Sequence, residues 1–516
     1  MFLQNDFMPF RHSCQGVRDM KKIIALILAA FMLIMPLTAY AGEEKMENIR
    51  ERGYYDKIIE KETKAIAKCA FSNGAIAMYA PSVSSYSSYS MPVVDGISPD
   101  EYTSWRSGKV MPYFSDTAVF GLIQTAKVTG SSNGKDVCLN YINWYISHMN
   151  TKESDISGVK GTVYDYFIFE SNDGRIVEVT TFDANKAKYP TGNPYDYDST
   201  DSYASLFLQI LYEYTNVYDN TFLDDKKEIV DDLVGVIQAT YVKGIDLTYA
   251  KPTYAICYMM DNCEVYCGYE SAEKIYREYL GDEKSADECR GYADKVKSAI
   301  TGRMWSKSKE MFLPNVDTKG VLSSSVDLNT FYPDGSCQLF PVIFGVITPD
   351  DEKAVLTYER FKKDFCQSGV IGKDWSVYDL KADPYPWCIL VRAVVAMKDY
   401  ETADRFINTV YKRFVLSTHG DPFYYCAESG HLLLAVCELY PLSVPELTEE
   451  SAEESAEASE ESEETSEASD VISAVSEENK NEAKKSPIVP ILIAAGAAAV
   501  IAAAVVIVLK KHGKKS

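Results

Sequence analysis

Acids that stand where apolar helices begin are the residues of this 516-residue chain best placed to do chemistry. Asp201 opens an apolar helical segment, three residues after Asp198, with Tyr197 and Tyr203 beside it. Two carboxyl groups that face each other can share acid–base work, one donating a proton to a leaving oxygen while the other activates water or attacks carbon. The helix dipole alone also favours an acid in the first turn, so a structural role for Asp201 stays open.

Asp261 and Glu264 form the second group of candidate acids. They follow the strongly apolar segment 254–260 and open the next expected helix, where a spacing of three puts both on one side of a turn. Capping of that helix by Asp261 or Asn262 is the structural alternative. We take Asp201 and Glu264 as the expected catalytic pair. The sequence does not give the distance between them, so the acid and base roles and the stereochemical outcome stay unassigned.

A wider set of acids and aromatic residues is expected to bind the substrate. Each stands near the start of a helical segment or in a turn, and each alone is more simply explained by capping, turn chemistry or core packing. Together they indicate a common cleft, because each falls where a helical segment would reach it. Asp383 precedes Trp387 in the same turn, and His431 follows Glu428. The expected substrate-binding residues are Asp116, Asp198, Tyr203, Asp261, Asp334, Trp387 and Glu428.

Other chemistries have little support in the sequence. It contains no Gly-x-Ser-x-Gly motif, no phosphate-binding loop and no dinucleotide-type glycine pattern. Its five histidines form no His-x-x-x-His pair, and no EF-hand loop is present, so we expect neither a metal nor a cofactor, with calcium left open by the acidity of the chain. The formal net charge of -23 makes nucleic acid an improbable partner, since a phosphate backbone needs clustered Lys and Arg.

The elements that must position these residues are mainly helices. From about residue 43 to 440, amphipathic helices alternate with loops that contain Gly, Pro or Asp, which predicts consecutive helical hairpins packed side by side. The cysteines are scattered singly through apolar patterns, which favours buried free thiols, although one or two disulfides remain open. The expected helices span residues 46–70, 116–128, 134–150, 201–217, 223–242, 264–280, 286–305, 351–366, 385–398, 401–414 and 427–439.

One insertion interrupts the helical pattern. Residues 164–169 and 175–180 alternate like strands, and Asn172-Asp173-Gly174 between them is a strong turn signal. We therefore expect a small β-hairpin on the helical body. A hairpin beside a cleft and a surface decoration are equally compatible with this pattern.

Several segments together resemble the six-hairpin glycosidase superfamily, whose fold is an (α/α)6 toroid. They are Asn73–Ile76, Met111–Asp116, Asn143–Asn150, Gly161–Tyr166, Asp198–Tyr203 and Met260–Tyr266. The resemblance implies a mainly α fold, an (α/α)6 toroid of helical hairpins across nearly the whole globular part. It also implies a central cleft for a carbohydrate, to which the 37 tyrosines could offer flat faces and hydroxyls. Lyases and non-catalytic proteins share this fold, so the fold alone does not fix the function.

The two ends of the chain carry targeting signals. Met20-Lys21-Lys22, the apolar run 23–37 and Ala39-Tyr40-Ala41 have the layout of a secretory signal peptide, which suggests a true start at Met20. Residues 488–509 carry no charge and are long enough to cross a bilayer, and the lysines after them predict a cytoplasmic C-terminus. Between the domain and this helix, residues 446–486 are rich in Glu, Ser and Ala and should form an extended stalk.

The expected organisation is therefore a single-pass cell-membrane protein with an extracellular catalytic or binding domain. Its parts are an N-terminal extension with signal peptide (1–41), a globular domain (42–445), a disordered stalk (446–486), a transmembrane helix (487–509) and a basic tail (510–516). We expect hydrolysis of an extracellular polysaccharide or oligosaccharide by two carboxyls. A non-catalytic glycan-binding or adhesion module is the alternative, and a polysaccharide lyase is less favoured because the chain is acidic and poor in histidine.

Overall fold

The computed structural model describes residues 48–83, 86–88, 91–188, 197–322, 326–327, 329–381, 383–417 and 421–443. All of them belong to the first of the two compact units of the chain, Met1–Glu446. The expected signal peptide, stalk, transmembrane helix and basic tail lie outside the described residues. Within those residues, no helix combines the length and the apolar character that a membrane span requires.

Helices dominate the described part of the chain, as expected. Most agree with the sequence pattern to within a few residues. Five starts differ by four to six residues. α4 and α9 begin four and five residues earlier than expected, whereas α2 begins six residues later, and α8 and α13 each begin four residues later, α13 after Pro384 and Pro386. The helices are α2 (Arg52–Lys68), α3 (Pro99–Tyr102), α4 (Pro112–Thr129), α5 (Lys135–Ser147), α6 (Thr181–Lys188), α7 (Thr200–Val217), α8 (Lys227–Ala239), α9 (Met259–Lys274), α10 (Glu283–Gly302), α11 (Phe340–Ile343), α12 (Glu352–Phe365), α13 (Ile389–Ala396), α14 (Tyr400–Val410) and α15 (Cys426–Leu439).

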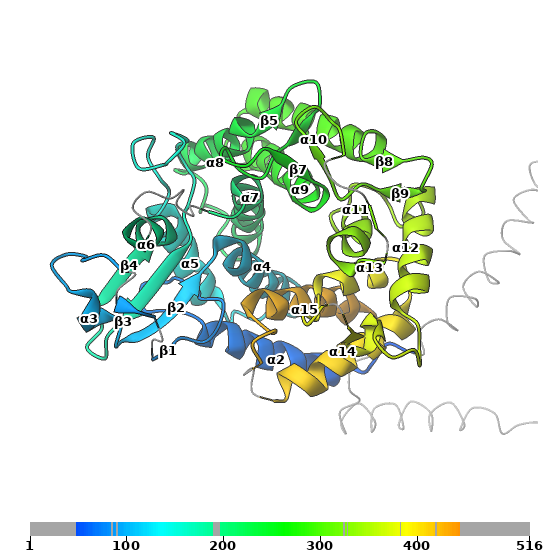
Figure 1. Ribbon diagram of the computed structural model, residues 1–516, viewed down its shortest axis with the longest axis horizontal. Helices are drawn as coiled ribbons and strands as arrows, with labels where there is room; N and C mark the ends of the chain where they lie inside the picture. Colours follow the sequence, from blue (N-terminus) through cyan, green and yellow to red (C-terminus); the bar gives the residue numbers. More distant parts are fainter. Residues whose placement is uncertain are drawn as a thin grey trace, which may run out of the picture. The chain divides into compact units, whose positions relative to one another are not determined.

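Six of these helices follow one another around an inner ring in the described structure (Figure 1). Each helix contacts the next in the order α4, α7, α9, α11, α13 and α15, and α15 packs onto α4, which closes the ring. On the outside, α5, α8, α10, α14 and α2 each pack on an inner helix, and α12 packs on the turn Ser336–Leu339 that leads into α11. This mainly helical ring is consistent with the expected toroid of helical hairpins.

The expected β-hairpin is present and belongs to a larger sheet on one side of the ring (Figure 1). Strands β3 (Tyr166–Glu170) and β4 (Ile176–Thr180) pair antiparallel, and β2 (Arg106–Val110) and β1 (Ser82–Val83) extend the sheet. A small core around Tyr102 and Phe169 supports this sheet. The sequence did not predict β1 and β2, because the Arg-Ser-Gly-Lys-Val segment lacks an alternating apolar pattern.

The remaining strands form two-stranded ribbons between helices. β7, which lies just before α9, pairs with β10, which follows α10 in the chain. β5 pairs with β6 just after α8. Their bounds are β5 (Tyr241–Val242), β6 (Leu247–Thr248), β7 (Ile256–Tyr258), β8 (Trp305–Ser306), β9 (Met311–Phe312), β10 (Asn315–Asp317), β11 (Lys373–Asp374) and β12 (Asp379–Leu380).

The inner ring is closed by very tight helix packing. A Cβ atom added at Gly430 on α15 would lie 2.4 Å from the carbonyl oxygen of Thr117 on α4, and one added at Gly121 would lie 2.7 Å from the carbonyl oxygen of Gly430. Only glycine permits such a close approach of two backbones. The cysteines of the described residues are all free and most are buried, which confirms the expected buried thiols.

Candidate functional site

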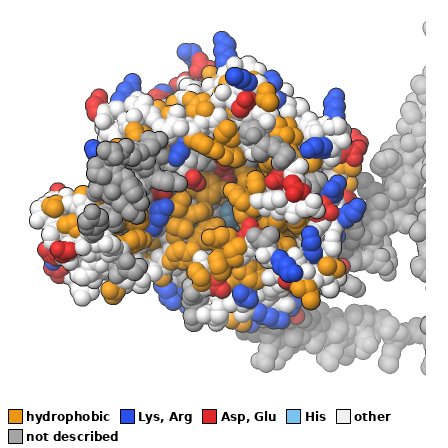
Figure 2. Space-filling model, in the orientation of Figure 1, with side chains coloured by type: hydrophobic (Ala, Val, Ile, Leu, Met, Phe, Trp, Pro, Cys, Tyr) orange, Lys and Arg blue, Asp and Glu red, His pale blue; other side chains and the backbone are white. Residues whose placement is uncertain are grey.

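The N-terminal ends of the six inner helices surround one cavity of about 420 Å³ in the described structure. Figure 2 shows apolar side chains gathered around this central hollow, with acidic side chains at its edge. The lining residues are Met78, Tyr113, Phe114, Asp198, Ser199, Ser202, Met260, Asp261, Tyr332, Phe340, Asp383, Pro384, Tyr385, Trp387, Ile389, Tyr425, Ala427, Glu428 and His431.

Asp198 and Asp261 form one acidic edge of the cavity. Asp198 is exposed just before α7, and Asp261 is half-buried in the first turn of α9. The Ser199 hydroxyl lies 2.7 Å from Asp201 Oδ1 and 3.2 Å from Asp261 Oδ2. Burial, together with the charges of Asp201 and Asp198, raises the pKa of Asp261 well above its usual value. The two expected substrate-binding acids are therefore brought together at the cavity.

Asp201 lies behind this edge and is fully buried. Its Oδ1 accepts hydrogen bonds from the Ser199 hydroxyl and the Ser202 amide, and its Oδ2 accepts one from the Thr248 hydroxyl at 2.7 Å. Burial raises its pKa to about 7 despite these hydrogen bonds. Both of its oxygens are thus occupied by neighbouring side chains and backbone, and Asp201 does not line the cavity.

Glu264 lies one turn deeper in α9 than Asp261 and is also buried. The Tyr113 hydroxyl, which does line the cavity, donates a hydrogen bond to Glu264 Oε1 over 2.7 Å. Burial and the charge of Asp261 raise the pKa of Glu264 to about 8. Glu264 does not line the cavity itself, but Tyr113 and Ser202, which do, lie beside it.

Glu428 stands on the other side of the ring, in the first turn of α15. Its Oε2 accepts a hydrogen bond from the Cys388 amide over 2.7 Å. Burial raises the pKa of Glu428 to about 7, the Cys388 amide opposes that rise, and the charge of Asp383 adds to it. Because α15 and α9 are three steps apart in the ring of six, Glu428 and Asp261 approach the cavity from opposite sides.

His431 lies one turn further along α15 and also lines the cavity. Burial, helped by the nearby Arg392 charge, lowers its pKa to about 3, so the imidazole is neutral. Its Nδ1 has no hydrogen-bond partner among the described residues, although the side chain is only 8% exposed. A buried polar atom without a partner costs free energy, which favours a ligand group at this position.

Aromatic rings form the rest of the wall. The ring centres of Trp387 and Tyr332 lie 4.7 Å apart, and Tyr332 is 49% exposed. Tyr385 and Phe114 lie around Tyr425 at 5.8 and 4.6 Å. Trp387 has a left-handed backbone with φ of 57°, a conformation that costs a bulky residue free energy and often marks a functional position.

Three other expected substrate-binding residues do not line the cavity. Asp116 is buried within α4 and accepts a hydrogen bond from the Tyr141 hydroxyl over 2.9 Å. Tyr203 is buried and donates to Asp165 Oδ1 over 2.9 Å. Asp334 accepts the Asp327 amide over 3.0 Å and thereby holds the turn that carries Tyr332. These three support the fold around the cavity.

Sequence reasoning missed several lining residues. Tyr332, Tyr385 and Tyr425 were not selected, although the first two stand beside prolines in segments that were considered for their acids. Adjacent Tyr and Pro residues before a helix were therefore the available signal. No group of three or more His, Cys, Asp or Glu residues in the described ranges could hold a metal ion.

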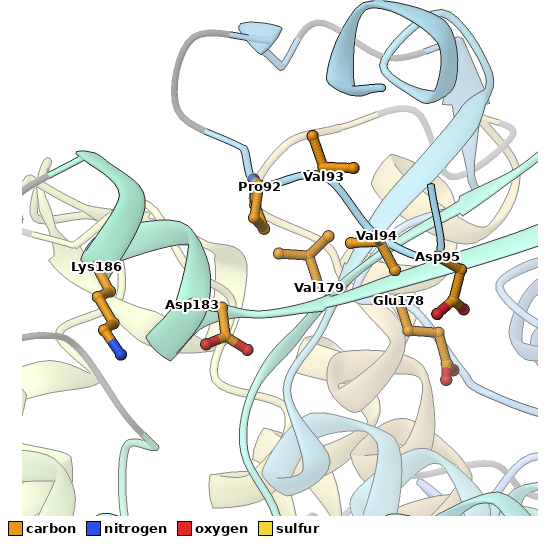
Figure 3. A pocket seen from close by; sticks show the side chains of 8 residues that line it. All are labelled: Pro92, Val93, Val94, Asp95, Glu178, Val179, Asp183 and Lys186. Atoms are coloured by element: carbon orange, nitrogen blue, oxygen red, sulfur yellow. The ribbon is translucent and has the colours of Figure 1, made fainter. Parts of the chain in front are cut away.

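A second hollow lies on the sheet side of the structure, between the loop 92–95, β4 and α6 (Figure 3). Its Glu178 already bonds to Asn73, Trp144 and His148, with Nε2 of His148 at 2.8 Å from Oε2. The other lining residues are Pro92, Val93, Val94, Asp95, Val179, Asp183 and Lys186. None of the expected site residues lies here.

Comparisons with known proteins agree with the fold only. No protein-family model and no curated protein match the chain. Among solved structures, a glycosidase in complex with glucose matches with 13% identity and a TM-score of 0.48, covering 76% of this chain and 98% of that one. A D-mannose isomerase matches with 11% identity and a TM-score of 0.46, covering 76% and 98%.

A further match is Rex8A from Paenibacillus barcinonensis complexed with xylose, with 13% identity and a TM-score of 0.42, covering 75% and 94%. These matches are in line with the expected resemblance and show similarity alone. With TM-scores below 0.5, they carry nothing about the reaction of this chain.

Proposed function

We propose that this protein binds a carbohydrate in the central cavity and hydrolyses a glycosidic bond there. The observation that carries the proposal is the placement of carboxyls on two sides of one aromatic-walled cavity. Asp198 and Asp261 reach it from α7 and α9, and Glu428 reaches it from α15. Aromatic faces suit the apolar faces of sugar rings, and two carboxyls supply the acid and the base that glycoside hydrolysis needs.

Glu428 is the proton donor in this proposal. With a pKa of about 7, Glu428 is protonated in a large fraction of the molecules near neutral pH. A general acid works best when its pKa lies close to the working pH. The Cys388 amide binds one carboxyl oxygen and thereby fixes the direction of the other.

The opposite edge supplies the carboxylate that activates water or attacks the sugar. Asp198 and Asp261 are the candidates, since both line the cavity and Asp198 is exposed. Asp201 and Glu264, the pair expected from the sequence, become positioning residues. They hold Ser199 and Tyr113, which line the cavity beside Asp261.

The test is a screen of natural and synthetic glycans with the full chain and four variants. Glu428→Gln and Asp261→Asn should each lose product release while they still bind the substrate. The matched controls Glu359→Gln and Asp294→Asn change exposed acids on the outer helices α12 and α10 and should behave like the parent. Full activity in both cavity variants would contradict the assignment.

A non-catalytic sugar receptor is the second candidate. It is favoured by the hydrogen bonds that occupy both oxygens of Asp201 and by the withdrawal of Asp201 and Glu264 from the cavity. A folded parent that binds a glycan tightly and releases no product from any of those tested would support this alternative.

We propose further that the helical ring is a complete (α/α)6 toroid and that it is displayed at the cell surface on the acidic stalk. The support is the sequence pattern of residues 20–41 and 446–516, together with the six inner helices. Protease treatment of intact cells should release the globular domain. Protection from protease until the cells are lysed would contradict this placement.

A further inference from the structure

We propose that the natural ligand carries a protonated amine, and that the cavity binds an amino sugar with its ammonium group at the edge formed by Asp198 and Asp261. This inference rests on the proposed carbohydrate function and specifies the substrate class. It also excludes acidic sugars, which the same edge would repel.

The charges of the cavity wall are one-sided. Its described lining residues include four carboxylic acids, Asp198, Asp261, Asp383 and Glu428, and no lysine or arginine. None of the four forms an ion pair with another described residue. Two other buried acids of the same structure have cationic partners, since Asp165 lies 3.4 Å from Lys109 and Glu170 pairs with Arg106, whereas Asp116 and Asp201 are buried without an ion pair to any described residue. A buried acid without a cation is costly, and a ligand cation would reduce that cost.

The hydrogen bonds around Ser199 show that too few donors face the acids at this edge. Its hydroxyl has one proton, but the oxygen lies within hydrogen-bonding distance of both Asp201 Oδ1 and Asp261 Oδ2. One hydroxyl proton cannot be donated to two ionised carboxylates at once. One of the two acids, Asp201 or Asp261, must therefore carry a proton, or Asp261 must face another donor. An ammonium group offers three donors and a positive charge, and it can supply what Ser199 lacks.

His431 is an independent sign that a polar ligand enters the cavity. It is more than nine-tenths buried, lines the cavity and leaves Nδ1 without a partner in the described residues. A neutral imidazole with a free nitrogen can accept a hydrogen bond from a sugar hydroxyl or amine, and it does not repel a cation. The partial positive charge of the helix N-termini is already complemented by the acids in their first turns.

The aromatic wall is compatible with the same ligand. Tyr332 is half-exposed and lies close enough to Asp261 and Asp198 for their charges to raise its pKa, although burial is the largest cause. An aromatic face attracts an ammonium group as well as the C–H face of a sugar ring. Tyr332 and Trp387 can therefore hold the ring whose amine the acidic edge binds.

The experiment measures binding of matched sugars to the full chain by calorimetry. Each set shares one ring configuration and differs only at C2, with a hydroxyl, an ammonium or an N-acetyl group. Gluco, galacto and manno monosaccharides are used, together with β-1,4-linked tetrasaccharides of the gluco series. In at least one set the amine should bind about tenfold more tightly than the hydroxyl compound, as expected for one additional charge-assisted contact.

The variants separate this inference from the proposed function. Asp261→Asn should abolish the preference for the amine over the hydroxyl compound, whereas Asp294→Asn should change neither this preference nor the affinity for the hydroxyl compound. The preference should also shrink as salt is added. Equal or weaker binding of every amine, with clear binding of neutral sugars, would overturn the amine inference alone. Absence of binding for every sugar would contradict the proposed carbohydrate function as well.

Discussion

The backbone amide of Cys388 donates a hydrogen bond to Glu428 over 2.7 Å, which ties the first turn of α15 to the segment just before α13. Trp387, the residue before Cys388, lines the same cavity. The expected proton donor and a stacking ring therefore depend on one short piece of backbone. Substitutions at these positions must keep that backbone in place if they are to report on chemistry.

Glu428→Gln meets this requirement, since the amide oxygen can still accept the Cys388 hydrogen bond. Loss of a general acid typically costs about 10²–10⁴-fold in rate. We expect such a loss on natural glycans and a much smaller loss on aryl glycosides with good leaving groups, which need no protonation. Steady-state kinetics on both substrate types measures the difference. Equal losses on both would contradict the role of Glu428, and Glu359→Gln is the matched control.

The rate should fall as the pH rises through the pKa of Glu428. Burial raises that pKa to about 7, so the acid form is lost above this pH. The charge of Asp383 contributes to the rise, and Asp383→Asn should therefore shift the alkaline limb of kcat/KM to lower pH. A pH–rate profile of parent and variant tests both points. An alkaline limb that stays in place in Asp383→Asn would show that another group controls it.

Stability should decrease as the pH rises from 7 to 9, because of Glu264. Burial raises its pKa from 4.5 to about 8 in the folded state. A carboxyl whose pKa is raised by folding contributes its full stabilisation below the pKa that it has in the unfolded state. This contribution is lost as the pH rises through the pKa that it has in the folded state. Folding lowers the pKa of His431 from 6.5 to about 3, so His431 makes stability rise with pH, but only below a pH of about 6.5.

Glu264→Gln should therefore flatten the dependence of Tm on pH above 7, since Gln can still accept the Tyr113 hydroxyl. Thermal unfolding at pH 7, 8 and 9 compares the parent, this variant and Glu359→Gln. The control should parallel the parent. If Glu264→Gln also parallels the parent, the buried Glu264 carboxyl has no raised pKa.

The placement of the acids shows what a sequence pattern can and cannot resolve. Helix starts were predicted well enough to bring Asp198, Asp261 and Glu428 to one cavity. Which acid faces the cavity depends on how each helix is rotated about its own axis, and the sequence does not give this rotation. Asp201 is only three residues after Asp198, but those residues carry it into the packed wall beneath Thr248. Glu264 is likewise one turn too deep.

The fold shows a similar limit. The β3–β4 hairpin was predictable because it combines alternating apolar residues with an Asn-Asp-Gly turn. The short helix α11 (Phe340–Ile343) was not predicted, since four residues that include Pro341 give no helical period. The closure of the ring depends on tertiary contacts of α15 with α4, which no local pattern reveals.

Glycine at the α4–α15 contact should be essential for stability. In Gly430→Ala the new methyl group would lie 2.4 Å from the Thr117 carbonyl oxygen and 2.7 Å from the Ala118 Cα, so two packed backbones must move apart. Overpacking of this kind costs about 1–3 kcal/mol. Gly291→Ala on α10, where a Cβ would meet nothing within 4 Å, should instead stabilise by up to about 1 kcal/mol. Denaturant unfolding of both variants measures the contrast, and similar effects at the two sites would contradict it.

Trp387 should trade stability for binding. Its φ of 57° is unfavourable for any residue except glycine, so the ring is held at the cavity at a conformational cost. Trp387→Ala and Trp387→Gly remove the same ring, and both should lose most glycan affinity because the face beside Tyr332 is gone. They should differ in stability, with the glycine variant more stable than the alanine variant by about 1–2 kcal/mol, since only glycine adopts this backbone without strain. Calorimetric binding and denaturant unfolding of the two variants give both values. A glycine variant no more stable than the alanine variant would show that the backbone at this position is not strained. Retained affinity in both variants would show that the Trp387 ring does not contact the sugar.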